Sequence, residues 1–143
     1  MSNGEDALQH PVPIQDWLAE HAQQLSTVPK PHHAVFEIIK TLAVGGEDKP
    51  TAGSLADIIK ELRSYALIQL GEEEQILAMK GFPDLADHLQ DHTLFREILE
   101  HMADRVQEGR TGMHHEIRHF LQVWWEDHVL KKDQKTRIFL EDN

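Results

Sequence analysis

The chain has 143 residues, which fits a single folded domain and leaves no room for a second catalytic one. Its 14 basic and 25 acidic residues give a formal net charge of -11, so the phosphate backbone of a nucleic acid would be repelled. Cysteine is absent, which excludes disulfides and thiolate metal sites, whereas histidine occurs 11 times. Any bound metal ion must therefore be held by nitrogen and oxygen atoms.

The N-terminal segment is polar and contains two prolines. We expect residues 1–13 to form a flexible N-terminal arm ahead of a single domain over residues 14–143, whose first part, residues 14–25, is an arm or a short helix. The segment lacks the basic start and apolar stretch of a secretory signal, and no apolar run approaches the roughly 20 residues that cross a bilayer. These features predict a cytoplasmic protein with neither a membrane nor a nucleic acid as partner, and they identify no protein partner.

Two amphipathic helices are predicted in the first half of the domain. Hydroxyl and proline residues at 26–31 predict the start of a first long helix that runs to about Val44. Glycine and proline residues at 45–53 then predict a loop. The second helix begins at Ser54, where a capping box is possible, and Gly81 ends it.

Two further helices are predicted in the second half. The third starts at Pro83 and ends around Gly109, and the fourth follows Gly112 and has its last turn in residues 129–132. The connections are short and no segment shows the alternation of a strand. The sequence therefore predicts an all-α fold, an antiparallel up-down four-helix bundle with an N-terminal arm.

Polar residues interrupt the apolar stripe of every predicted helix. They are His32 in the first, Glu73 in the second, His88 and His92 in the third and His128 in the fourth, with Asp133 just beyond it. A lone inward histidine is more often a hydrogen-bonded core residue than a ligand. Burying four imidazoles and two carboxylates together, however, costs several kcal/mol for each group that nothing compensates. The set as a whole therefore predicts a metal site.

The ligand types narrow the choice of metal. His88 and His92 lie four residues apart, so they share one helix face and can bind one ion as a pair. Imidazole and carboxylate without thiolate suit iron, manganese or zinc, and two carboxylates that can bridge suit a site with two ions.

The spacing of these residues resembles the pattern of the hemerythrin family. The matching elements, in chain order, are Trp17, His32-x-x-Val35-Phe36, Gly81-Phe82-Pro83, His88-x-x-x-His92-x-x-Phe95 and Phe120-Leu121-x-x-Trp124-Trp125-x-x-His128-Val129-x-x-x-Asp133. They cover about residues 17–133 in the correct order.

The resemblance implies a non-haem di-iron centre with an oxo or hydroxo bridge that binds dioxygen. By resemblance, one iron is held by three histidines and a second by His32, with two carboxylates bridging the irons. The three histidines are His88, His92 and His128, and the bridging carboxylates are Glu73 and Asp133. Where the family has a further histidine, four residues before the bridging glutamate, this chain has Gln69, a weaker neutral ligand that remains a candidate.

The resemblance also places a gas pocket near the end of the fourth helix. Its expected residues are Trp124, Trp125 and Val129, and Trp125 stands where the family usually has leucine. The remaining histidines that fall outside the pattern are expected to lie on the surface: His21, His114, His115 and His119.

Three functions stay open on the sequence alone. The first is a protein that carries, stores or senses dioxygen or another diatomic gas at two irons. The second is an enzyme that acts on oxygen, peroxide or nitric oxide, for which Gln69 is the motivation. The third is a bundle that holds one metal ion without gas chemistry. We expect a binding protein more than an enzyme, because no catalytic acid or nucleophile accompanies the ligands.

Overall fold

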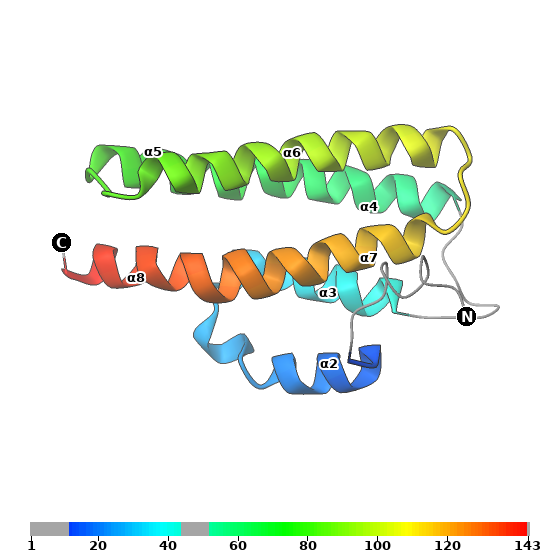
Figure 1. Cartoon of the computed structure of the whole chain (residues 1–143), viewed down its shortest axis with the longest axis horizontal. Helices are drawn as coiled ribbons and strands as arrows, with labels where there is room; N and C mark the ends of the chain where they lie inside the picture. The colour runs from blue at the N-terminus through cyan, green and yellow to red at the C-terminus, as the bar shows by residue number, and fades with distance from the viewer. Residues whose placement is uncertain (1–11, 44–51, 143) are drawn as a thin grey trace.

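A computed structural model describes residues 12–43 and 52–142. Every regular element among these residues is helical, which confirms the predicted all-α class (Figure 1). Residues 1–11 of the predicted arm and residues 44–51 of the predicted loop lie outside the described part of the chain.

The helical elements are short and interrupted in the N-terminal part of the domain and long and continuous in the later part. The N-terminal part is interrupted: α2 (Ile14–Ala22), the 3-10 turns η1 (Leu25–Thr27) and η2 (Lys30–His32), and α3 (His33–Leu42). The later part forms long continuous rods: α4 (Ala52–Ser64), the π-helical η4 (Tyr65–Leu70) and α5 (Gly71–Met79); α6 (Leu85–Gln107); and α7 (Met113–Trp124), the π-helical η5 (Trp125–Lys132) and α8 (Asp133–Asp142).

The helices pack in two pairs, with α4 against α6 and α3 against α7. In Figure 1 the α4–α5 rod lies along α6, the α7–α8 rod lies below them beside α3, and α2 lies on the outer side of α3. Helix α2 is held there by Trp17, which is fully buried and stacks on Phe36 with ring centroids 6.1 Å apart. The indole N–H of Trp17 also donates a hydrogen bond to the carboxylate of Glu126. Residues 14–22 are therefore a packed helix.

The predicted apolar stripes form the core. Along α6, for example, Phe95, Leu99 and Met102 are all buried, at the three- and four-residue steps that one helix face requires. Gly81 ends the α5 rod as predicted, with a φ of 71°, a left-handed conformation that glycine adopts without a steric penalty.

The structure corrects three details of the predicted helices. Helix α4 begins at Ala52, two residues before the predicted capping box. His32 lies in the 3-10 turn η2 just before α3 rather than within the helix. The inward stripe of the second predicted helix runs through Glu73 to Ile76, yet Ile76 is 45% exposed and Leu77 is buried instead. The π-helical turn η4 explains this last shift, because its wider turn inserts residues into the α-helical register.

The largest correction concerns the end of the fourth helix. The fourth helix does not end in residues 129–132, as predicted, but continues through α8 to Asp142. The basic residues there resemble a helix C-terminus, yet Lys132 is engaged in ion pairs with Asp87 and Asp91 on α6. Packing of Phe139 on Phe82, with ring centroids 5.1 Å apart, holds the added turns.

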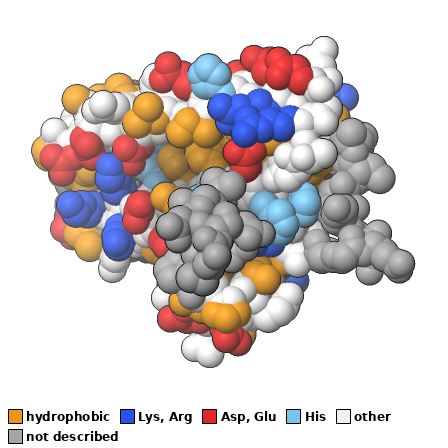
Figure 2. Space-filling model, turned by 45° about the vertical axis from the view of Figure 1, so that its right-hand side comes forward, with side chains coloured by type: hydrophobic (Ala, Val, Ile, Leu, Met, Phe, Trp, Pro, Cys, Tyr) orange, Lys and Arg blue, Asp and Glu red, His pale blue; other side chains and the backbone are white. Residues whose placement is uncertain are grey.

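The surface carries mixed charge. On the face shown in Figure 2, acidic and basic side chains are interspersed around a group of hydrophobic ones. No helix within residues 12–43 and 52–142 is long and apolar enough to cross a bilayer.

Candidate metal centre

Two π-helical turns, η4 and η5, carry or adjoin predicted metal ligands. Gln69 lies in η4, and His128 lies in η5, with Asp133 directly after it. In a π-helix each N–H bonds five residues back, and the wider turn brings side chains five apart closer to one face than an α-helix does. The backbone thus allows His128 and Asp133 to point into the same interior space.

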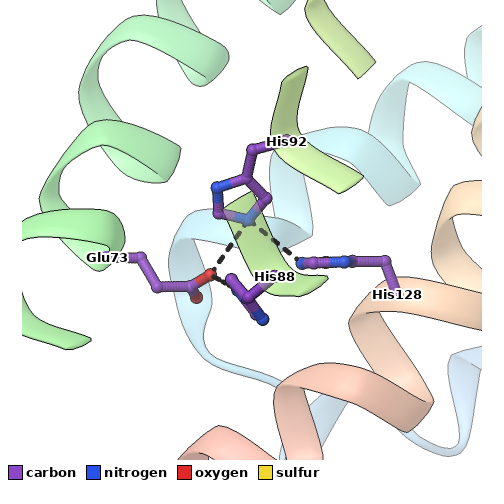
Figure 3. Close-up of side chains that lie close together, drawn as sticks. All are labelled: Glu73, His88, His92 and His128. Atoms are coloured by element: carbon purple, nitrogen blue, oxygen red, sulfur yellow. Dashed lines mark hydrogen bonds and ion pairs between the residues drawn. The ribbon is translucent and has the colours of Figure 1, made fainter. Parts of the chain in front are cut away.

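A first group of four side chains converges between α5, α6 and η5 (Figure 3). One ligand atom from each lies within 4.8 Å of the others, in the set Glu73, His88, His92 and His128. The Nε2 atom of His92 lies 3.2 Å from Glu73 Oε1 and 3.2 Å from the Nε2 atom of His128. His88 Nε2 also contacts Glu73 Oε1. His88 and His92 therefore direct Nε2 toward the same oxygen of Glu73, and His128 directs its Nε2 toward that of His92.

A second group shares a carboxylate with the first. It consists of His32, Glu73 and Asp133. His32 Nε2 lies 3.2 Å from one oxygen of Asp133, and the other oxygen lies 3.2 Å from His128 Nε2 and 3.6 Å from His88 Nε2. Glu73 and Asp133 thus lie between the two groups, which is the arrangement that carboxylates bridging two ions require.

Asp133 provides a test of whether a cation fits. Its side chain is 2% exposed, and neither carboxylate oxygen has a hydrogen-bond donor among the described residues. A buried carboxylate without donors is costly, so a cation at this position would satisfy it. Burial raises the pKa of Asp133 well above its ordinary value, and the nearby charge of Glu73 raises this pKa further. The donor set fits a metal ion.

His32, His128 and Glu73 are in the protonation states that a metal requires. Burial lowers the pKa of His128 to about 4, with His88 adding to the effect, so His128 is neutral at pH 7. Burial also lowers the pKa of His32, although Asp133 opposes this. Burial alone would raise the pKa of Glu73, but the hydrogen bonds with His88 and His92 outweigh it and hold this pKa well below its usual range. The neutral imidazoles of His32 and His128 and the ionised carboxylate of Glu73 are ready to coordinate.

The far nitrogen of each of three histidines is anchored by an oxygen. Nδ1 of His92 lies 2.8 Å from Glu74 and Nδ1 of His128 lies 3.1 Å from Asp91. Nδ1 of His32 lies 2.7 Å from the hydroxyl oxygen of Tyr65. In His32 and His128, a proton on Nδ1 that is donated to these oxygens leaves the lone pair of Nε2 directed into the centre. In His92, which contacts a carboxylate through each ring nitrogen, a metal ion would replace the proton on Nε2.

The two anchoring carboxylates each have a cation of their own. Arg96 lies 2.9 Å from Glu74, and Lys132 lies 2.7 Å from Asp91. Sequence reasoning missed both carboxylates, because it followed only the inward stripes. The one signal available was that each stands beside a predicted ligand in the sequence, Glu74 after Glu73 and Asp91 before His92.

Gln69 lies at the edge of the second group. It is half-buried and lines a cavity of about 210 Å³ together with His32, Glu73 and Asp133. The structure therefore brings the substituted position to the second group, on the side where that group meets a cavity.

The three residues predicted for a gas pocket are all buried, and one of them contacts a candidate ligand. Trp124 stacks on the ring of His128, with centroids 4.0 Å apart and planes 8° apart. Trp125 packs against Phe36 in the core, with centroids 5.4 Å apart, and Val129 is fully buried. Trp124 is thus in contact with a candidate ligand, and the gas pocket stays a prediction.

Two of the four histidines expected on the surface are in fact buried. His21 is 8% exposed and lies against Trp17 with centroids 4.2 Å apart, because α2 is a packed helix. His114 is also 8% exposed, in the first turn of α7. His115 is exposed as expected, and His119 is half-buried.

The fold and the centre together define the class of protein: an all-helical protein whose candidate metal centre consists of imidazole and carboxylate groups. The model of the hemerythrin HHE cation binding domain matches residues 12–136, so the chain belongs to that family. A bacteriohemerythrin of Clostridium acetobutylicum is 27% identical over 128 residues, which cover 83% of this chain and 95% of the relative. A bacteriohemerythrin of Stenotrophomonas maltophilia is 24% identical over 110 residues, covering 77% and 71% respectively. No solved structure matches the chain.

Proposed function

We propose that this protein is a non-haem di-iron protein that binds dioxygen as a carrier, store or sensor. The single observation that carries the proposal is the pair of ligand groups that share Glu73 and enclose Asp133 between them. Membership of the hemerythrin family and the similarity to two bacteriohemerythrins support the choice of iron and dioxygen. We also propose that residues 14–143 form one antiparallel up-down four-helix bundle.

Each ligand has a proposed place. The first iron is held by the three histidines of the first group, and the second iron by His32, with Gln69 as a further oxygen ligand. Glu73 and Asp133 bridge the two ions, together with an oxo or hydroxo group. When bound, the two irons would supply the two electrons that dioxygen takes up on binding and returns to them on release. The protein holds the ligands in place through Nδ1 contacts and keeps water from the rings of His92 and His128, which are fully buried.

One observation favours a second candidate function. The 210 Å³ cavity reaches Gln69, His32 and Asp133 and is also lined by the exposed side chain of Ile76. A second ion with a weaker ligand and access to this cavity would be open to peroxide or nitric oxide, which suits an enzyme. The protein would then turn over peroxide or nitric oxide in addition to binding dioxygen.

The test combines metal content with spectroscopy. We expect two irons per chain, and a visible charge-transfer band that forms in air and disappears on deoxygenation. Gln69→His should strengthen the band, His88→Ala should abolish it, and His115→Ala, at an exposed position, should leave it unchanged. One ion per chain and no band would favour the mononuclear alternative. Steady turnover of peroxide or nitric oxide above that of the metal-free protein would favour the enzyme.

A further inference from the structure

A groove of about 560 Å³ runs along the outside of α6 and the α7–η5 rod. Its floor is formed by large apolar side chains, namely Leu94, Ile98, Phe120, Val123 and Trp124. Three of them are strongly exposed for their type: Leu94 by 47%, and Ile98 and Val123 by 40% each. A continuous exposed apolar surface of this kind marks a binding site more often than isolated residues do.

The groove is polar at one end only. Asp91 meets Lys132 at 2.7 Å, whereas one turn further along α6 Phe95 meets Phe120, with ring centroids 5.1 Å apart. Ile98 lies beyond Phe95, toward the apolar end. The section of α6 from Asp91 to Ile98 rises by about 10 Å at the helical rise per residue. The groove is therefore a short apolar channel whose polar end, here called the basic end, has three lysines and two aspartates, namely Lys131, Lys132, Lys135, Asp91 and Asp127.

The basic end has charge available for a ligand. Lys131, Lys132 and Lys135 all line the groove, in a chain whose formal net charge is -11. Lys132 is engaged with Asp87 and Asp91. Among residues 12–43 and 52–142, the ion-pair partner of Lys131 is Asp127 at 3.7 Å, and both side chains are highly exposed. Such exposed pairs contribute little to stability, so Lys131 can exchange its partner.

We propose that this groove binds a single-chain carboxylate with an apolar tail, of the medium-chain fatty acid class. The tail lies over Leu94, Ile98 and Val123, and the carboxylate meets Lys131 and Lys135. The volume falls within the range of small-ligand sites, about 300 to 1,000 Å³. A peptide would leave backbone groups unsatisfied on this apolar floor.

The structure supplies a reporter for occupancy. Trp124 lines the groove, whereas Trp17 and Trp125 are fully buried elsewhere in the core. Trp124 also stacks on His128 at 4.0 Å, so a ligand over its other face would change the emission of this tryptophan first. The groove is lined by His128 and Asp91 but not by Glu73, His88 or His92, so it borders the metal centre through one ligand, and the metal content is held constant when binding is compared.

The experiment titrates the full-length protein, with its metal content measured, with decanoate, decanol and decyltrimethylammonium. Tryptophan emission and calorimetry follow binding, and sedimentation follows the oligomeric state. We expect one decanoate per chain, bound roughly tenfold more tightly than decanol because two exposed charge contacts favour the carboxylate, and no binding of the cation.

Three variants locate the site. The double variant Lys131→Gln, Lys135→Gln should abolish the preference for decanoate over decanol. The single variant Val123→Asp should lower the affinity for both decanoate and decanol. Lys60→Gln, at an exposed lysine on α4, is the matched control and should change nothing. All variants should keep the metal content of the parent. Equal affinity for the acid and the alcohol, no binding below the micelle concentration, or a dimer that Val123→Asp dissociates would each overturn the proposal.

Discussion

The stability of the metal-free protein should increase when Asp133 is replaced by asparagine. In the native chain this carboxylate is buried, 2% exposed, and neither oxygen has a hydrogen-bond donor among the described residues. Leaving such a group unsatisfied costs about 1 to 3 kcal/mol, and Asp133→Asn removes the charge while keeping the shape. We therefore expect the free energy of unfolding in the presence of a chelator to rise by about 1 to 3 kcal/mol at pH 8.

The pH dependence has a definite sign. Because the folded-state pKa of Asp133 is raised, the folded protein keeps a proton on this group at pH values where the unfolded chain has lost it. The destabilising charge is therefore present above the raised pKa and disappears as the pH falls through it. The gain from Asp133→Asn should be largest at pH 8 and should shrink toward pH 5.

Urea unfolding at the two pH values, with and without bound metal, measures the effect. The metal-loaded protein should show the opposite sign, since the variant loses a proposed bridging ligand. Asp127→Asn, at an exposed carboxylate on η5, is the control and should change stability by less than about 0.5 kcal/mol. A variant that destabilises the metal-free protein equally at pH 5 and pH 8 would refute the argument that Asp133 is an unsatisfied buried charge.

Three further predictions concern the anchoring groups and the backbone. Glu74→Gln and Asp91→Asn should each weaken metal binding by roughly 10- to 100-fold in a chelator competition, because they position His92 and His128; an affinity equal to that of the parent would show that the Nδ1 contacts are dispensable. Gly81→Ala should lower the free energy of unfolding by about 1 to 2 kcal/mol, since its φ is 71° and a Cβ there meets no other atom, so only the backbone is strained. Gly71→Ala, within the continuous α4–α5 rod and equally open, should raise it by about 0.5 to 1 kcal/mol, and urea unfolding that shows the same sign for both alanines would contradict this.

Much of the fold could be predicted because helix periodicity is a local property. Side chains at every third or fourth position share a face, so the stripes through Val35, Phe95 and Ile117 correctly predict residues that are buried. The same rule predicts that His32 and His128 face inward, and both are buried. The structure brings all six predicted histidine and carboxylate ligands together, because the inward faces of packed helices must meet in one core.

The sequence by itself therefore predicted most of the inward-facing positions and the six histidine and carboxylate side chains that meet in the core, but it misplaced Ile76, His21 and His114. Only the tertiary structure decided the π-helical turns, the extension of α8, the burial of His21 and the anchoring of His128 by Asp91. Each of these depends on what one helix meets on another. Lys132 illustrates the reason: its position in the sequence is typical of a helix end, yet its ion pair with Asp91 on α6 forms only because the two helices pack side by side.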